Sequence, residues 1–243
     1  MTPSLSAVSD EQVMSITTQE PEQSGRYNAA TRVIASTLGV LVGIGSIEHG
    51  LLECLQGFRP THGLIVNALG PGYRWTVWTQ GGEGACTLIP NFLVTGVVSS
   101  LLGALIIVWS LCHLQSRRGP IVFLLIGVAS FLSGGGVAQV PLIVLTWGVA
   151  TRIRASLAFW RWLIPAGIEP VLGKCWPWTL FSSTVAFLIA LDIAVFGYFP
   201  GLSEQVELQH ICWSFLAIGL TLYVVSICFG FAYDVRTYAE DRR

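Results

Sequence analysis

The chain has 243 residues, of which 53% are hydrophobic and only 11% are charged, and its formal net charge is −1. Soluble domains contain about 25% charged residues, so this composition excludes an ordinary soluble domain and predicts an integral membrane protein. The near-neutral charge also argues against a nucleic-acid partner, because nucleic-acid-binding domains carry a basic patch.

The polar N-terminal segment, which we assign to residues 1–27, lacks apolar periodicity. Such a composition predicts a disordered tail. The segment also lacks the basic start and the short apolar core of a signal peptide. We therefore expect the first apolar run to stay in the protein as a membrane anchor.

Five hydrophobic runs follow the tail, within a predicted transmembrane helical domain of residues 28–235. A helix needs about 20 apolar residues to cross a bilayer, and backbone exposed to lipid must be helical. The fold class is therefore an all-α integral membrane bundle, and residues 236–243 form a short cytoplasmic tail. Full transmembrane helices are predicted at about 33–56, 88–113, 178–199 and 210–233.

The third run, residues 120–150, is too long for one upright helix. At 1.5 Å per residue, a helix of this length would extend about 46 Å. A Gly-Gly-Gly sequence at 134–136 is followed by Pro141, and both residue types oppose helix formation. We expect a break near 133–141. Either one tilted and kinked helix crosses, or two short segments turn back as a re-entrant hairpin, which gives five or six membrane helices in all.

The distribution of Lys and Arg distinguishes these alternatives, because cytoplasmic loops are enriched in both residues. If the N-terminus is cytoplasmic and the third run turns back, eleven basic residues fall inside and two, Arg59 and Arg74, fall outside. A single crossing gives four inside and nine outside. The reversed single crossing gives nine inside and four outside, and it stays the second choice. We expect the hairpin, with both termini cytoplasmic, in the cell membrane.

Two further features concern how the runs pack. Residues 151–177 mix Trp with Arg, a combination that suits the headgroup layer, so we expect an interfacial segment. Small residues recur at helical spacing on the first two runs, which lets helices approach closely in lipid. They are Gly39, Gly43, Ser46 and Gly50 on the first run, and Gly96, Ser100 and Gly103 on the second.

The first run also carries polar residues, in the stretch GIGSIEHGLLECLQ at 43–56. His49 and Glu53 are four residues apart and share a helix face, and Glu48 precedes His49. Glu53 lies along the small-residue stripe, so we expect it to point into the bundle. A charge at the bilayer centre costs several kcal/mol, so these groups need partners, water, or both.

In the hairpin topology, other polar residues fall at a similar depth. Asp192 lies at about the depth of Glu48, while Asn91 and His210 lie near the outer starts of their helices. The sequence therefore predicts a ligand- or ion-binding layer near the outer surface. Its members are Glu48, His49, Glu53, Asn91, Asp192 and His210.

Four interpretations of this layer are open. It is a structural polar network that fixes helix register, or a cation or proton site in a transport path, since intramembrane carboxylates and histidines mark such routes. A third interpretation is a divalent metal, which His and carboxylates suit. The fourth is contact with a haem, a quinone or a lipid head. His113, near the inner end of the second helix, is a candidate haem ligand.

The remaining motifs assign no catalytic residue and require no cofactor. The six cysteines include no CxxC pair, which argues against a redox or zinc motif. Cys54 and Cys86 flank the first loop and would pair only in an oxidising compartment.

We expect a small transport or channel-type protein with a protonatable outer site. The alternatives are a metal- or haem-binding enzyme or redox subunit, and a non-catalytic subunit of a membrane complex. The expected partners are the lipid bilayer and other membrane proteins or a second copy of the chain.

Overall fold

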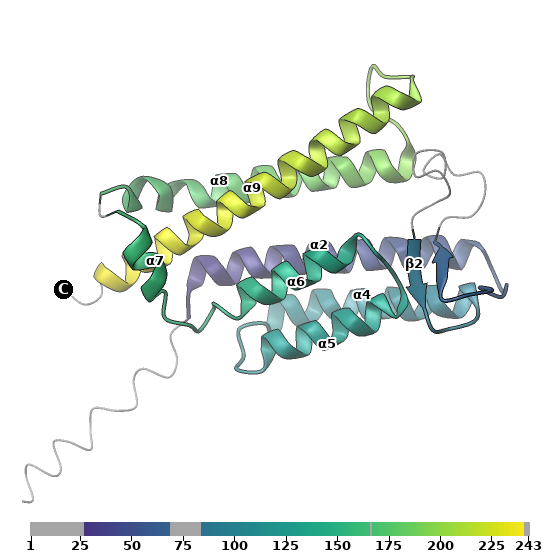
Figure 1. Ribbon diagram of the computed structural model, residues 1–243, viewed down its shortest axis with the longest axis horizontal. Helices are drawn as coiled ribbons and strands as arrows, with labels where there is room; N and C mark the ends of the chain where they lie inside the picture. The colour runs from purple at the N-terminus through teal and green to yellow at the C-terminus, as the bar shows by residue number, and fades with distance from the viewer. Residues whose placement is uncertain (1–26, 69–83, 166, 241–243) are drawn as a thin grey trace, which may run out of the picture.

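The computed structural model describes residues 27–68, 84–165 and 167–240. In this part of the chain, long helices lie roughly side by side and a small sheet lies near one end (Figure 1). The long helices are α2 (Ala29–Leu55), α4 (Phe92–Cys112), α8 (Glu169–Phe196) and α9 (Gln205–Glu240). The shorter helices are α5 (Gly119–Phe131), α6 (Gln139–Ala150) and α7 (Ala158–Leu163).

Four helices in the described part are long and apolar enough to cross a membrane, by length and composition. They are α2, α4, α8 and the Gln205–Thr237 part of α9, and each overlaps one of the four runs predicted as full transmembrane helices, with ends that differ by a few residues or more. Helix α8 begins at Glu169, earlier than predicted, and contains Pro177. Its first turns pack on α9, where the Trp176 and Tyr233 rings lie 6.0 Å apart.

Helices α2 and α4 pack through the predicted stripes of small residues. A Cβ added at Gly43 would lie 2.7 Å from the carbonyl oxygen of Gly103, and one at Gly103 would lie 2.9 Å from the backbone nitrogen of Ile47. Further along, a Cβ at Gly96 would lie 2.7 Å from the backbone nitrogen of Cys54. These contacts are backbone to backbone, so only glycine permits this helix separation.

The third run turns back as a hairpin, which is the alternative that the distribution of Lys and Arg favoured. It forms α5, a strand β3 (Ser133–Gly136) and α6. Its two ends meet at the same end of the bundle, because Arg154 Nε donates to the carbonyl of Gln115 at 2.7 Å. The Gly-Gly-Gly sequence ends the first helix as predicted, and Gly134 adopts a φ of 105° that favours glycine.

A three-stranded antiparallel sheet, in the order β1-β2-β3, was not predicted and corrects the all-α expectation. Strand β1 (Ile65–Asn67) and strand β2 (Gly84–Thr87) come from the first loop. In this sheet Ala85 pairs with Gly136 of β3. Strands of three or four residues are too short to leave a readable alternation of polar and apolar residues.

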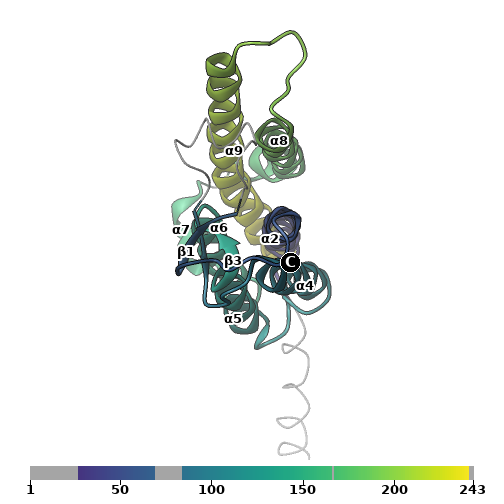
Figure 2. The same ribbon diagram turned by 90° about the vertical axis from the view of Figure 1, so that its right-hand side faces the viewer.

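Helices α8 and α9 form a second layer against the bundle of α2, α4, α5 and α6. Both views show α9 approaching α2 toward its C-terminal end and diverging from it toward its N-terminal end (Figures 1 and 2). The close end is held by buried Tyr223, whose hydroxyl donates to the carbonyl of Ile34. Where the layers diverge, a pocket opens between them.

Candidate functional site

The C-terminal half of α2 carries the three polar residues that the sequence analysis singled out. Glu48 is half-buried, while His49 and Glu53 are 3% and 0% exposed. Because Glu53 lies four residues after His49, the two share one helix face. The expectation that Glu53 points into the bundle agrees with its burial.

The Glu53 carboxyl group lies against the glycine-rich strand β3. A Cβ at Gly134 would lie 2.6 Å from Glu53 Oε1 and 2.8 Å from Glu53 Cδ, so only glycine leaves room for the carboxyl group. Strand β3 is fixed here by Thr95, whose hydroxyl donates to the carbonyl of Ser133 at 2.7 Å. Neither carboxyl oxygen of Glu53 has a hydrogen-bond partner among the described residues.

A buried hydroxyl–amide network lies nearer the middle of α2. Ser46 Oγ contacts Gln139 Oε1 at 2.8 Å, and Ser130 Oγ donates to Ser46 Oγ at 3.1 Å. Ser99 Oγ donates to the carbonyl of Ser46 at 3.2 Å. These four side chains come from α2, α4, α5 and α6, so the network ties all the helices of this layer together.

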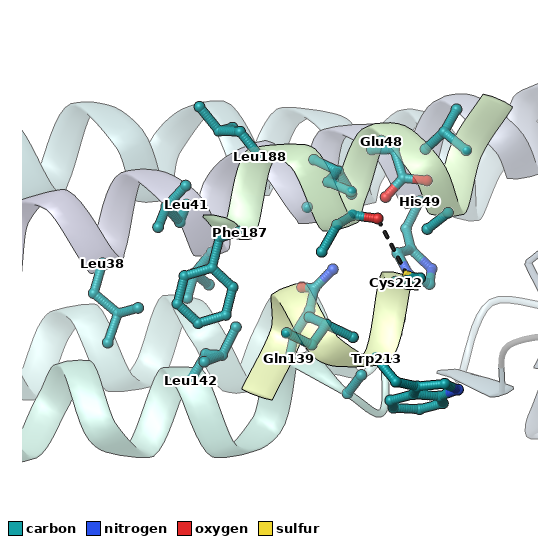
Figure 3. Close-up of a pocket in the computed structure, with 18 residues that line it drawn as sticks. Leu38, Leu41, Glu48, His49, Gln139, Leu142, Phe187, Leu188, Cys212 and Trp213 are labelled. Atoms are coloured by element: carbon teal, nitrogen blue, oxygen red, sulfur yellow. Dashed lines mark hydrogen bonds between the residues drawn. The ribbon is translucent and has the colours of Figure 1, made fainter. Parts of the chain in front are cut away.

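The pocket between the two layers has a volume of about 230 Å³ and is lined by residues of α2, α6, α8 and α9. Glu48, His49 and Gln139 supply its polar lining, with Cys212 beside them. Figure 3 shows Glu48, His49 and Cys212 toward one end, Leu38 toward the other and Gln139 between them. The pocket is therefore an apolar space with a polar end.

The other predicted site residues lie elsewhere. Asn91 caps α4, and its Oδ1 accepts hydrogen bonds from the backbone nitrogens of Leu93 and Val94 at 3.1 and 3.2 Å. Asp192 lies at the level of the pocket, but its side chain is exposed, as is that of His210. Neither residue lines the pocket. Of the predicted layer, the structure gathers only Glu48, His49 and Glu53.

Several residues bear on the metal and haem alternatives. Cys54 and Cys86 are free thiols. His113 is exposed and stacks on Trp109 with a ring separation of 4.9 Å. Among the described residues, no group of three or more His, Cys, Asp or Glu side chains is arranged to hold a metal ion. The described part of the chain thus offers no donor set that favours a metal centre.

Among the buried polar residues that sequence reasoning missed, two stand out. Gln139 is 7% exposed, and it is the only amide side chain in the third run. Asp234 is 3% exposed and accepts hydrogen bonds from the backbone nitrogens of Ala30 and Thr31 at 3.0 and 2.9 Å. Each stands out as a rare polar residue in or beside an apolar run, and that was the available signal.

Comparisons with known proteins give no further guide to the site: no family model matches the chain, and no curated protein or solved structure shows significant similarity to it.

Proposed function

We propose that the chain is a multi-pass protein of the cell membrane that transports a proton or a small cation through a site at Glu53 and His49. The observation that carries the proposal is the Glu53 carboxyl group, which is fully buried and has no hydrogen-bond partner among the described residues. A carboxylate in such surroundings requires a proton or a bound cation, because an isolated buried charge is very costly. Ionisable groups inside a membrane commonly mark ion and proton routes.

The position of Glu53 supports a site whose change of charge is coupled to movement of the hairpin between α5 and α6. Its carboxyl group rests on strand β3, which joins the two short helices α5 and α6. Non-helical backbone at membrane depth is tolerated only where protein buries it or water lines it. Gain or loss of a charge at Glu53 would therefore act directly on the turn of this hairpin.

The distribution of basic residues supports an orientation with both termini cytoplasmic. Lys and Arg are enriched on the cytoplasmic side of membrane proteins. In the described part of the chain, all but Arg59 belong to segments at the end where α2 begins and α9 finishes. These residues are Arg32, Arg117, Arg118, Arg152, Arg154, Arg161, Lys174 and Arg236.

The short helix α7 supports a membrane boundary at this same end. Its Phe159 and Trp162 side chains are 63% and 79% exposed, and Arg161 lies between them. Aromatic and basic side chains together suit the headgroup layer. In this placement the sheet and the buried Glu53 lie toward the outer surface.

A flux assay on purified protein in liposomes tests the proposal. With a pH-sensitive dye inside the liposomes, and with Na⁺ or K⁺ gradients in parallel, Glu53→Gln should reduce the flux to the level of protein-free liposomes. Asp192→Asn, an exposed carboxylate at the level of the pocket, is the matched control and should conduct like the wild type. Equal flux in the wild type and in Glu53→Gln, or none in either, contradicts the proposal.

A second candidate function, a non-catalytic subunit of a membrane complex, is favoured by the network around Ser46. This network links four helices through buried hydrogen bonds, as a register-fixing element would. If Ser46→Ala lowers the melting temperature while the wild type shows no flux, this second function is preferred.

A further inference from the structure

The pocket between the two layers is elongated. Glu53 is not among the residues that line it. Its lining follows α2 from Leu38 to His49, a distance of about 16 Å at 1.5 Å per residue. Its volume is about 230 Å³, whereas an engineered apolar cavity of about 150 Å³ already binds benzene. A space this long for its volume fits a narrow chain better than a compact ring system.

Gln139 lines this pocket and carries a buried hydrogen-bond donor, its amide nitrogen. The side chain is 7% exposed, and its Oε1 atom is engaged by the Ser46 hydroxyl. Its Nε2 atom has no hydrogen-bond partner among the described residues. A buried donor without a partner is destabilising, so an acceptor atom in the pocket would stabilise this arrangement. Figure 3 shows the amide between Phe187 and Leu142 on one side and Cys212 on the other.

The position of Gln139 along the bundle indicates how a ligand would lie. Gln139 is the first residue of α6, and two residues separate it from the end of β3, so it is close to the end of the bundle that carries the sheet. From there the pocket runs toward Leu38, deeper in the bundle. A membrane lipid has the same layout, with ester carbonyls at the edge of the hydrocarbon core and acyl chains pointing inward.

We propose that this pocket binds one acyl chain of a membrane phospholipid, with the ester carbonyl oxygen accepting a hydrogen bond from Gln139 Nε2. The inference rests on the membrane placement in the proposed function but not on transport. The apolar lining supplied by Leu38, Leu142, Phe187 and Leu216 would contact the chain. Because the chain comes from an equally apolar bilayer, these contacts replace its packing against other lipids, while the single hydrogen bond fixes the position of the chain.

Photolabelling tests the proposal with the full chain in vesicles of phosphatidylethanolamine and phosphatidylglycerol. A fraction of the phosphatidylglycerol carries a photoactivatable group in one acyl chain. Mass spectrometry of the labelled peptides should place the label on Leu142 and Phe187 more strongly than on exposed Leu125, which lies outside the pocket. Labelling of the pocket no stronger than that of Leu125 overturns the proposal.

Two variants separate the hydrogen bond from the apolar contacts. Gln139→Met, which keeps the side-chain length, should weaken pocket labelling about five-fold, the loss expected for one hydrogen bond of about 1 kcal/mol. Ala194→Phe fills the pocket and should abolish the labelling, whereas Ser182→Phe, on the exposed face of α8, should leave it unchanged. Unchanged labelling in Gln139→Met or in Ala194→Phe contradicts the proposal.

Two further measurements complete the test. Melting temperatures in detergent identify any variant that fails to fold, and pocket labelling is then compared only among folded variants. Extraction of the purified wild-type protein should yield phospholipid, and recovery of a quinone in its place overturns the inference. Normal labelling in Glu53→Gln, together with lost flux, would show that the lipid site and the transport site are separate.

Discussion

Asp234 illustrates how one residue can fix the relative position of two distant helices. It lies near the end of α9, but its carboxylate accepts bonds from the first backbone N–H groups of α2 and from the Thr31 hydroxyl at 2.6 Å. The first N–H groups of a helix have no partner within the helix, and a negative charge at this end is favoured by the helix dipole. The adjacent Asn28 makes no cap of its own, so Asp234 takes this role from another segment.

We expect Asp234→Ala to destabilise the protein by about 2 kcal/mol, at the upper end of the range for a lost helix N-cap. The cause is that the buried N–H groups of Ala30 and Thr31 would lose the carboxylate that accepts their hydrogen bonds. Thermal unfolding in detergent, followed by circular dichroism, measures the effect. Asp192→Ala removes an exposed carboxylate and should change the melting temperature little. Equal shifts in both variants would argue against the capping role.

At the scale of elements, the close packing of α2 on α4 depends on glycines at the points of contact. A Cβ at Gly43 would lie 2.5 Å from Ile107 Cγ1 and 2.7 Å from the carbonyl oxygen of Gly103. Because backbone cannot move aside as a flexible side chain does, any larger residue must push the helices apart. Ser46 and Glu53 both belong to α2. The geometry of the Ser46 network and of the Glu53 site therefore depends on this close approach.

The prediction for this pair is that Gly43→Ala lowers stability by about 1–3 kcal/mol, the usual cost of overpacking. Gly148→Ala is the matched control, because a Cβ added there meets nothing within 4 Å in helix α6. Alanine is favoured over glycine in helices by about 1 kcal/mol, so this control should be neutral or stabilising. The melting temperature of Gly43→Ala should therefore fall, while that of Gly148→Ala should stay the same or rise. A similar fall in both variants would contradict the packing argument.

At the scale of the whole molecule, the turn at β3 determines which polar residues share an end. Because α5 and α6 turn back, α8 begins at the end where α2 begins, and Leu191 and Ala194 reach the level of Glu48 in the pocket. A single crossing would have reversed α8 and α9 relative to α2. The pocket, its polar end and the basic end of the molecule all follow from this one turn.

Cysteine accessibility tests this topology in membranes. In a variant that lacks the six native cysteines, we would introduce Ser116→Cys, Lys174→Cys or Glu204→Cys at exposed positions. A membrane-impermeant maleimide should label position 204 in intact cells, and positions 116 and 174 only after permeabilisation. Labelling of 116 and 174 from opposite sides would show that the third run crosses the membrane once.

The sequence by itself determined the features that depend on local composition. Runs of apolar residues located the four long helices, the Gly-Gly-Gly sequence located the break in the third run, and the spacing of Gly43 and its neighbours identified the face that packs on α4. Each of these properties is a function of residues close together in the chain. The level of Asp192 beside Glu48 also required the hairpin topology, which the distribution of Lys and Arg along the chain favoured.

Only the tertiary structure decided which groups meet. The depth of Asp192 follows from its position in the helix, but the rotation of α8, which exposes this side chain, depends on how α8 packs against α9. The contact of Glu53 with Gly134 and the capping of α2 by Asp234 join segments separated by about 80 and 200 residues. No local periodicity encodes such pairs, because the energy of each contact depends on the packing of the whole bundle.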